Sequence, residues 1–175
     1  ARPQGIEVAD NGRGTAPHLA SALLGLQSGA QFLEVHYPGG AQAMQATLGG
    51  QTQMMVETYN VVAGNVQGGR MRILASMGDR VEAGLESFPL ASKTVPGAVA
   101  HGWFAVIAKK GVDPQVLARL NKDMNEALLL PDVVAKSREL GTYPRPGTPE
   151  QLARYIAEDR KTWQDVLDKL NIKPE

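Results

Sequence analysis

The stretch that most constrains the fold is residues 10–18, Asp-Asn-Gly-Arg-Gly-Thr-Ala-Pro-His. Residues 6–9 before it alternate in polarity and include β-branched side chains, as a short strand does. Apolar residues after it recur at helical spacing. The sequence therefore predicts a strand, a glycine-rich turn and a helix whose free N–H groups and dipole could bind an anion. An ordinary turn without a ligand fits the same residues, so both interpretations stay open here.

The rest of the chain continues this alternation of strands and helices. Strands are expected at residues 32–36, 52–57, 72–76 and 103–107. Helices are expected at residues 41–48, around 61–66, at 114–129 and 131–141, and from residue 149 toward the C-terminus. Residues 78–100 lack periodicity and predict loop and extended chain with one short helical turn. Alternation of this kind predicts an α/β fold with parallel strands and crossover helices.

Composition excludes several functional classes. The 175 residues carry 18 basic and 18 acidic side chains, so the formal net charge of zero gives no support for binding nucleic acid or a membrane surface. No apolar run approaches the ~20 residues that a membrane-spanning helix needs. The absence of cysteine rules out disulfides and thiolate metal sites.

Three strand-to-helix turns are expected at one edge of the sheet. They are residues 10–18, 37–40 and 57–60, and each is polar or glycine-rich. In a parallel sheet such turns lie at the carboxyl edge, where ligands bind. Three helix N-termini near one crevice favour a carboxylate or a phosphate.

The individual residues of these turns also have purely structural explanations. Thr15 can cap its own helix, and one hydroxyl can both cap and bind. His18 in a first turn can be a solvated or capping residue, and Tyr37 can lie at the edge of the core with its hydroxyl at the surface. Glu57 at a strand end is either a solvated carboxylate or an acceptor for a ligand ammonium or hydroxyl. Arg13 is expected to be exposed.

The motifs of common enzymes are missing. There is no Gly-x-Ser-x-Gly and no P-loop lysine signature, and His18, His36 and His101 lack zinc-like spacing. Pro17 stands where a dinucleotide fingerprint needs its third glycine, and Glu34 lies within its strand instead of at the end. We therefore expect no catalytic residues, no cofactor and no metal ion.

Taken in order, the motifs resemble the Bug/TctC family, the periplasmic solute-binding proteins of tripartite tricarboxylate transporters. The resemblance runs from about residue 5 to the end of the chain and rests on an ordered set of short motifs. These are Gly12-x-Gly14-Thr15-x-x-His18-Leu19, Val35-x-Tyr37-x-Gly39-x-Ala41, Leu48-Gly49-Gly50-Gln51, Gly69-x-x-Arg72-x-Leu74-Ala75, Trp103-Phe104, Leu117-Ala118-x-Leu120-Asn121, Leu140-Gly141, Gly147-Thr148-Pro149-Glu150-Gln151 and Ile172-Lys173-Pro174-Glu175.

This resemblance implies a type II periplasmic binding fold, with two α/β lobes and a ligand between them. Residues 1–98 would be lobe two, and residues 99–175 the returning strand and C-terminal helices of lobe one, whose N-terminal half has no counterpart here. The implied ligand is a small organic carboxylate, the implied partner is a membrane permease, and the implied location is the periplasm. With the turns above, the resemblance gives these candidate ligand-binding residues: Gly14, Thr15, Ala16, His18, Tyr37, Gly39, Gly40, Glu57 and Thr58.

The chain departs from the family pattern in three places, which leaves other functions open. Glu57 replaces the usual Asp, Asn60 replaces the usual proline, and residues 87–90 read Ser-Phe-Pro-Leu where Asp-Val-Pro-Thr is usual. The alternative is a sensory or protein-interaction module derived from this family, and an α/β enzyme using the same crevice is a third possibility. The apolar strand at residues 103–107 and apolar stripes on the following helices lack a sheet to cover them. They predict self-association, by exchange of residues 99–175 between two copies.

Overall fold

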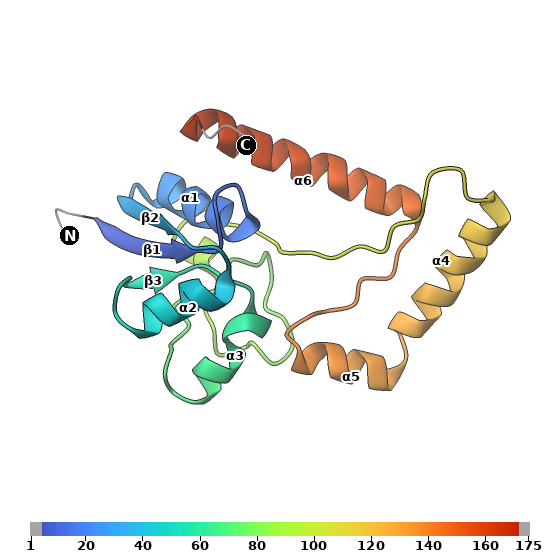
Figure 1. Ribbon diagram of the computed structural model, residues 1–175. Coiled ribbons are helices and arrows are strands. Elements are labelled where there is room, and N and C mark those ends of the chain that lie inside the picture. The colour runs from blue at the N-terminus through green and yellow to red at the C-terminus, as the bar shows by residue number, and fades with distance from the viewer. Residues whose placement is uncertain (1–4, 172–175) are drawn as a thin grey trace. The chain divides into compact units, whose positions relative to one another are not determined.

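The computed structural model describes residues 5–171, and the chain divides into two compact units (Figure 1). The first unit consists of Ala1–Gly102 with Trp163–Glu175, and the second of Trp103–Thr162. These units differ from the predicted segments 1–98 and 99–175 in that residues 163–175 belong to the first unit. The assignment of these segments to lobes stays a prediction, and the motif at residues 172–175 lies outside the described part.

A small parallel sheet organises the first unit. Its strands are β1 (Ile6–Asp10), β2 (Phe32–His36) and β3 (Met54–Met55), in the order β2-β1-β3. Both pairings of β1 are parallel, as the sequence predicts, and β1 aligns with β2 along its whole length, from Ile6 opposite Phe32 to Asp10 opposite His36. The carboxyl ends of all three strands therefore lie at one edge.

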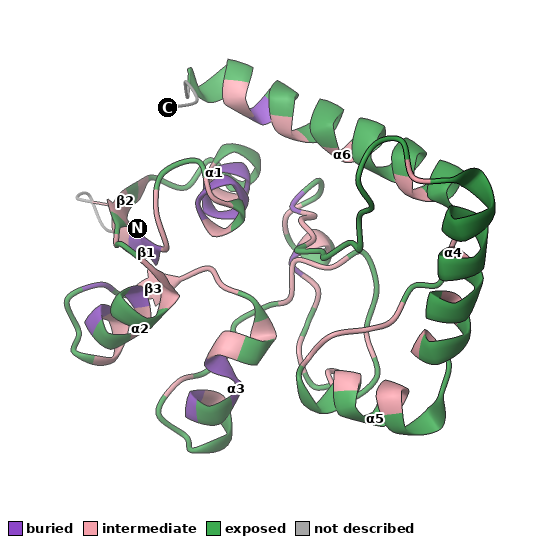
Figure 2. Cartoon of the chain, turned by 45° about the vertical axis from the view of Figure 1, so that its right-hand side comes forward, coloured by how far each residue is buried: buried purple, intermediate pink, exposed green. Residues whose placement is uncertain are grey.

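Three helices follow the three strands of this unit. They are α1 (Ala16–Ser28), α2 (Gly40–Leu48) and α3 (Tyr59–Gln67), all within a few residues of the predicted positions. Central strand β1 and one face of each helix form the core, whose buried residues include Val8, Ala9, Leu19, Leu23, Ala43, Ala46 and Val62 (Figure 2). The core thus lies directly behind the edge on which the predicted turns meet.

The second unit consists mainly of helices. These are α4 (Pro114–Leu128), α5 (Pro131–Glu139) and the first part of α6 (Pro149–Leu170). Each begins at a proline, which is favourable there because the N–H that proline lacks would have no intrahelical acceptor. The carboxylate of Asp113 caps α4 by accepting from the N–H of Gln115 at 2.7 Å. None of residues 103–162 is buried (Figure 2), so the predicted inner faces of these helices are open in the structure.

Two of the predicted strands are wrong. Residues 72–76 run extended but make only one parallel bridge, between Ser76 and Leu90, because no ladder of neighbouring backbone groups lies beside them. Residues 103–107 form no strand either, and Phe104 is 90% and Ile107 is 84% exposed. Apolar sequence favours a strand, but only a hydrogen-bonded neighbour makes one, and the described residues supply none there.

Two smaller predictions have different outcomes. The third strand is only Met54–Met55 instead of residues 52–57. The short helical turn expected within residues 78–100 is confirmed as a 3-10 turn at Ala91–Lys93. Among the described residues, no helix has the length and apolar character to cross a membrane.

Candidate functional site

The three turns that follow the strands meet at the carboxyl edge of the sheet. The amide of Asn11, in the first turn, donates to Oε2 of Glu57 at the start of the third turn, at 3.3 Å. Gly40, in the second turn, lies so close that a Cβ on it would be 2.8 Å from the same oxygen. The N–H of Tyr37 donates to the carbonyl of Asp10 at 3.1 Å. The predicted convergence of the turns is thus present in the structure.

The turn between β1 and α1 is held by hydrogen bonds from both flanking elements. Gly12 and Gly14 have φ of 123° and 75°, values that glycine adopts without strain. The N–H of Gly12 donates to Oδ1 of Asp10 at 2.8 Å, and the N–H of Gly14 donates to Nδ1 of His18 at 2.9 Å. The hydroxyl of Thr15 donates to the carbonyl of Gly12 at 2.6 Å. The turn conformation is therefore fixed before any ligand arrives.

At the N-terminus of α1, the hydrogen-bond donors available to an anion are main-chain N–H groups and not the hydroxyl of Thr15. Thr15 is the N-cap residue, but it makes no side-chain capping bond, because its proton already goes to Gly12. Pro17 has no N–H, so the donors of the first turn that lack an intrahelical acceptor are the N–H groups of Ala16 and His18. An anion at this helix end would be bound by backbone.

His18 is a buried residue with a local structural role, which excludes the solvated side chain that the sequence left open as one alternative. It is 2% exposed, and its Nδ1 accepts from Gly14. Because an acceptor nitrogen carries no hydrogen, Nε2 carries it and donates to Oε2 of Glu34 at 2.9 Å. The other oxygen of Glu34 accepts from the hydroxyl of Ser21 at 3.1 Å. Both ring nitrogens are used inside the fold, so contact of His18 with a ligand would come from its backbone N–H.

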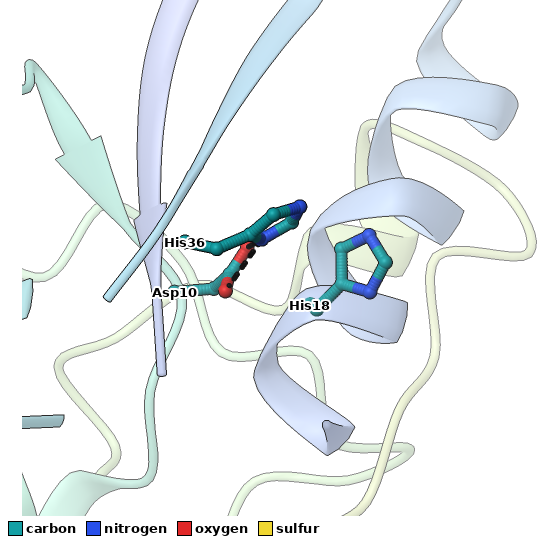
Figure 3. A group of neighbouring side chains, drawn as sticks. All are labelled: Asp10, His18 and His36. Atoms are coloured by element: carbon teal, nitrogen blue, oxygen red, sulfur yellow. Dashed lines mark hydrogen bonds and ion pairs between the residues drawn. The ribbon is translucent and has the colours of Figure 1, made fainter. Parts of the chain in front are cut away.

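A second histidine pairs with the carboxylate that closes β1. The side chain of Asp10 is fully buried, and Nδ1 of His36 lies 2.9 Å and 2.8 Å from its two oxygens (Figure 3). The rings of His36 and His18 are edge-to-face, with centroids 4.8 Å apart. This pair was not predicted, because Asp10 and His36 lie far apart in the sequence. The signal was available, since Asp10 and His36 end adjacent parallel strands and Glu34 lies on the same face two residues earlier.

Among the described residues, Asp10, His18 and His36 form a group whose residue types could hold a metal ion, but hydrogen bonds within the fold already use most of their ligand atoms. Their nearest ligand atoms lie within 4.8 Å of one another. Both nitrogens of His18, however, are directed at Gly14 and Glu34. Hydrogen bonding explains the cluster without a metal.

Glu57 makes one side of this edge rich in acceptors. Its Oε1 accepts from the N–H of Thr58 at 2.8 Å and from the Thr58 hydroxyl at 3.2 Å, while Oε2 lies beside Asn11 and Gly40. No ion pair among the described residues involves Glu57. Oδ1 of Asn11 is buried without a hydrogen-bond partner. The N-termini of α2 and α3 thus already face the carboxylate of Glu57. Of the three helix N-termini that were expected to bind an anion, only that of α1 remains available.

The remaining candidates lie in the same turns but make fewer side-chain contacts. Tyr37 is half-buried and Thr58 is exposed. Gly39 is the N-cap residue of α2, and its carbonyl accepts from the N–H of Ala43 at 3.1 Å. The structure brings all of these residues to one edge, and their contact with a ligand stays a prediction.

The chain matches one family model and several curated proteins. Residues 1–172 match the family model described as "Tripartite tricarboxylate transporter family receptor", TctC. Protein BugT of Bordetella pertussis is 32% identical over 174 residues, which are 99% of this chain and 53% of BugT. A protein of Pseudomonas knackmussii, named for the clcB-clcD intergenic region, is 30% identical over 89% of this chain and 94% of its own length. The chain spans about half the length of the other curated relatives that it matches.

Solved structures show the same fold. An R. palustris protein with adipate superposes with a TM-score of 0.89 at 23% identity, over 99% of this chain and 58% of that protein. MatC from Rhodopseudomonas palustris with bound malate gives a TM-score of 0.78 at 25% identity, over 93% of this chain and 56% of MatC. The α/β fold predicted from the sequence is therefore that of TctC-type binding proteins, of which this chain spans about half.

Proposed function

Because the chain belongs to the tripartite tricarboxylate transporter receptor family, TctC, we propose that it contributes to the capture of a small organic carboxylate in the periplasm for a membrane permease. The family and fold are those of solute-binding proteins, and hydrogen bonds within the protein hold the turns at the carboxyl edge of the sheet, which supports this proposal. In this proposal the protein does no chemistry. Its work is to hold a solute until the permease accepts it.

The start of α1 is the observation that carries this proposal. The turn from Gly12 to Thr15 is locked by hydrogen bonds, and it leaves the backbone N–H groups of Ala16 and His18 without an intrahelical acceptor. Such donors, aligned with the helix dipole, stabilise a carboxylate. Two structural relatives are recorded with adipate and with malate, which are both dicarboxylates.

Glu57 and Asn11 support a second feature of the ligand. The carboxylate of Glu57 lies at the same edge as α1 and is held by the side-chain amide of Asn11, whose Oδ1 is buried without a partner. A ligand hydroxyl or ammonium group would donate to the carboxylate of Glu57, whereas a second ligand carboxylate there would meet the negative charge of Glu57. We therefore favour a hydroxy- or amino-substituted carboxylate over a plain one.

The remainder of the binding cleft would come from outside the described sheet edge. In this proposal residues 1–98 are lobe two and residues 99–175 are part of lobe one. The relatives that are about twice as long as this chain are consistent with a site formed by two lobes. Affinity of the 175-residue chain alone is then expected to be weak.

Calorimetry and thermal shift can test the proposed site. We expect malate, which has a hydroxyl, to stabilise the protein more than adipate, and nucleotides not to stabilise it. Ala16→Pro removes one of the two N–H donors at a position that tolerates proline, whereas Ala16→Gly keeps the N–H and serves as its matched control. Loss of malate binding in both variants, or stabilisation by nucleotides alone, would contradict the proposed carboxylate site.

A further inference from the structure

Two histidines lie beside residues 12–15, the turn between β1 and α1 that we call the ligand turn. They contact this turn in opposite ways. His36 reaches the turn through Asp10, whose carboxylate accepts from Nδ1 of His36 and from the N–H of Gly12. His18 reaches it directly, since its Nδ1 accepts from the N–H of Gly14 at 2.9 Å. One histidine is therefore a donor at this point, and the other is an acceptor.

This difference decides what a proton does to each contact. An ionised carboxylate only accepts, so Nδ1 of His36 already carries its hydrogen and a second proton would go to Nε2, which leaves the bond to Asp10 intact. Nδ1 of His18 has no hydrogen. A proton placed there would point at the N–H of Gly14, and two donors would face each other at the distance of a hydrogen bond.

We propose that His18 is a positioning residue for the ligand turn, that only its neutral form holds the N–H of Gly14, and that protonation of His18 releases residues 12–15. The relevance of this device to solute capture rests on the proposed function. Its existence does not, because the hydrogen bond belongs to the protein without any solute. The outcome for a receptor is a turn that is ordered when His18 is neutral and loosened in acid.

The groups around His18 determine which of its contacts is lost on protonation, and that contact is the one with the turn. From β2, Glu34 accepts from Nε2 in either protonation state, so that side of the ring stays fixed. From β1, the carboxylate of Asp10 is engaged by His36 and Gly12. His36, also from β2, lies edge-to-face with His18, and a charge on one ring opposes a charge on the other. The contact between His18 and Gly14 is the one that a proton converts from attraction to repulsion.

Nuclear magnetic resonance on the full 175-residue chain tests this inference without a ligand. The nitrogen shifts of His18 and the amide of Gly14 are followed from pH 8 to pH 4.5. At pH 8 we expect the tautomer with hydrogen on Nε2. As His18 gains its proton, the exchange protection of the Gly14 amide should fall at least tenfold with the same midpoint. The N–H of Tyr37, which donates to the carbonyl of Asp10, is the internal reference and should keep its protection.

Three variants separate positioning from simple packing. His18→Asn supplies an oxygen near the place of Nδ1 that cannot titrate, so protection of Gly14 should persist and lose its pH dependence. His18→Leu fills the volume without an acceptor, so protection should be low at every pH. His36→Asn keeps a donor for Asp10 and is the matched control, in which the pH dependence should remain.

Each outcome decides the proposal. Protection of Gly14 that does not change while His18 titrates would overturn it, as would the same pH dependence in His18→Asn. A parallel loss at Tyr37 would show general unfolding instead of local release and would also overturn it. Malate titrations at both ends of the pH range then ask about function separately: absence of malate binding at every pH contradicts the proposed function and leaves the amide result standing.

Discussion

Gly40 and Glu57 are packed so closely that a single added carbon would collide, since a Cβ on Gly40 would lie 2.8 Å from Oε2 of the glutamate. This approach lets Glu57 reach the start of α2 while it also accepts from Asn11 and Thr58. Glycine at this position therefore leaves room for the Glu57 carboxylate between the second turn and the third.

Gly40→Ala should displace the Glu57 carboxylate and break its bond with Asn11. The colliding atom is the end of a flexible side chain, so we expect a stability loss below about 1 kcal/mol, mainly from one hydrogen bond. The side-chain amide resonances of Asn11 report the change directly. If they do not move in Gly40→Ala, Glu57 does not occupy the place that the structure gives it.

Gly14→Ala should destabilise the protein through backbone strain alone. A Cβ at Gly14 would meet nothing within 4 Å, but its φ of 75° is unfavourable for alanine by roughly 1–2 kcal/mol. Gly29 closes the other end of α1 at φ 66° in similarly open space, so Gly29→Ala is a matched control with a similar cost in chemical denaturation. Only Gly14→Ala should also weaken malate binding. An equal effect of both variants on binding would remove the turn from the site.

The sequence predicted most of the fold that local patterns and caps determine. The strands β1 and β2 and the helices α1 to α6 follow from short-range signals, and the parallel pairing follows from the alternation of strands and helices along the chain. The failures at residues 72–76 and 103–107 have one cause: a strand depends on a neighbour far away in sequence, and no local pattern reveals whether that neighbour exists.

The arrangement of the turns at the candidate site was predicted, but several side-chain contacts there were not. The meeting of three turns at one edge followed from parallel topology alone. The roles of His18 and Glu57 did not, because each depends on which atom of a side chain is engaged. His18 donates to Glu34 and accepts from Gly14, and Glu57 occupies helix starts that a ligand was expected to use. Pairing Asp10 with His36 across the strand register would have shown part of this network in advance.

The capping box at the start of α6 gives a prediction away from the site. The N–H of Gln151 donates to Oγ1 of Thr148 at 3.2 Å, and Oε1 of Gln151 accepts from the Thr148 N–H at 2.8 Å. Thr148→Ala should cost about 1 kcal/mol of helix stability. Circular dichroism during thermal unfolding measures this, and Thr162→Ala in the exposed middle of α6 is the control. Equal midpoints for the two variants would argue against the cap.

Glu150 reports on the same cap through its titration. Its pKa lies below the ordinary glutamate value, first because of a side-chain hydrogen bond with Thr148, then because of its own backbone N–H and the charge of Arg154. Because this pKa is lowered by folding, ionised Glu150 contributes to stability above the ordinary glutamate range. The contribution is lost as the pH falls through the pKa of Glu150 in the folded protein. Thr148→Ala should raise the pKa of Glu150 toward the ordinary value. A carboxyl titration followed by carbon resonance would measure it, and an unchanged pKa would show that the hydroxyl does not reach Glu150.

The open apolar surface of residues 103–162 leads to the last prediction, which is self-association of the 175-residue chain. None of these residues is buried, and Phe104, Val106 and Ile107 are 90%, 74% and 84% exposed. Apolar surface on this scale marks a site of association, and an extended segment with unpaired backbone groups can pair with another chain. Exchange of residues 99–175 between two copies would cover both the apolar side chains and the unpaired backbone groups at low cost.

Light scattering at micromolar concentration should show dimers or larger species. Phe104→Asp with Ile107→Lys should shift the population toward monomer without changing the circular dichroism spectrum, whereas Lys109→Asp with Lys110→Asp changes charge nearby and should not. A wild-type chain that stays monomeric at all these concentrations would mean that these side chains are covered within one molecule.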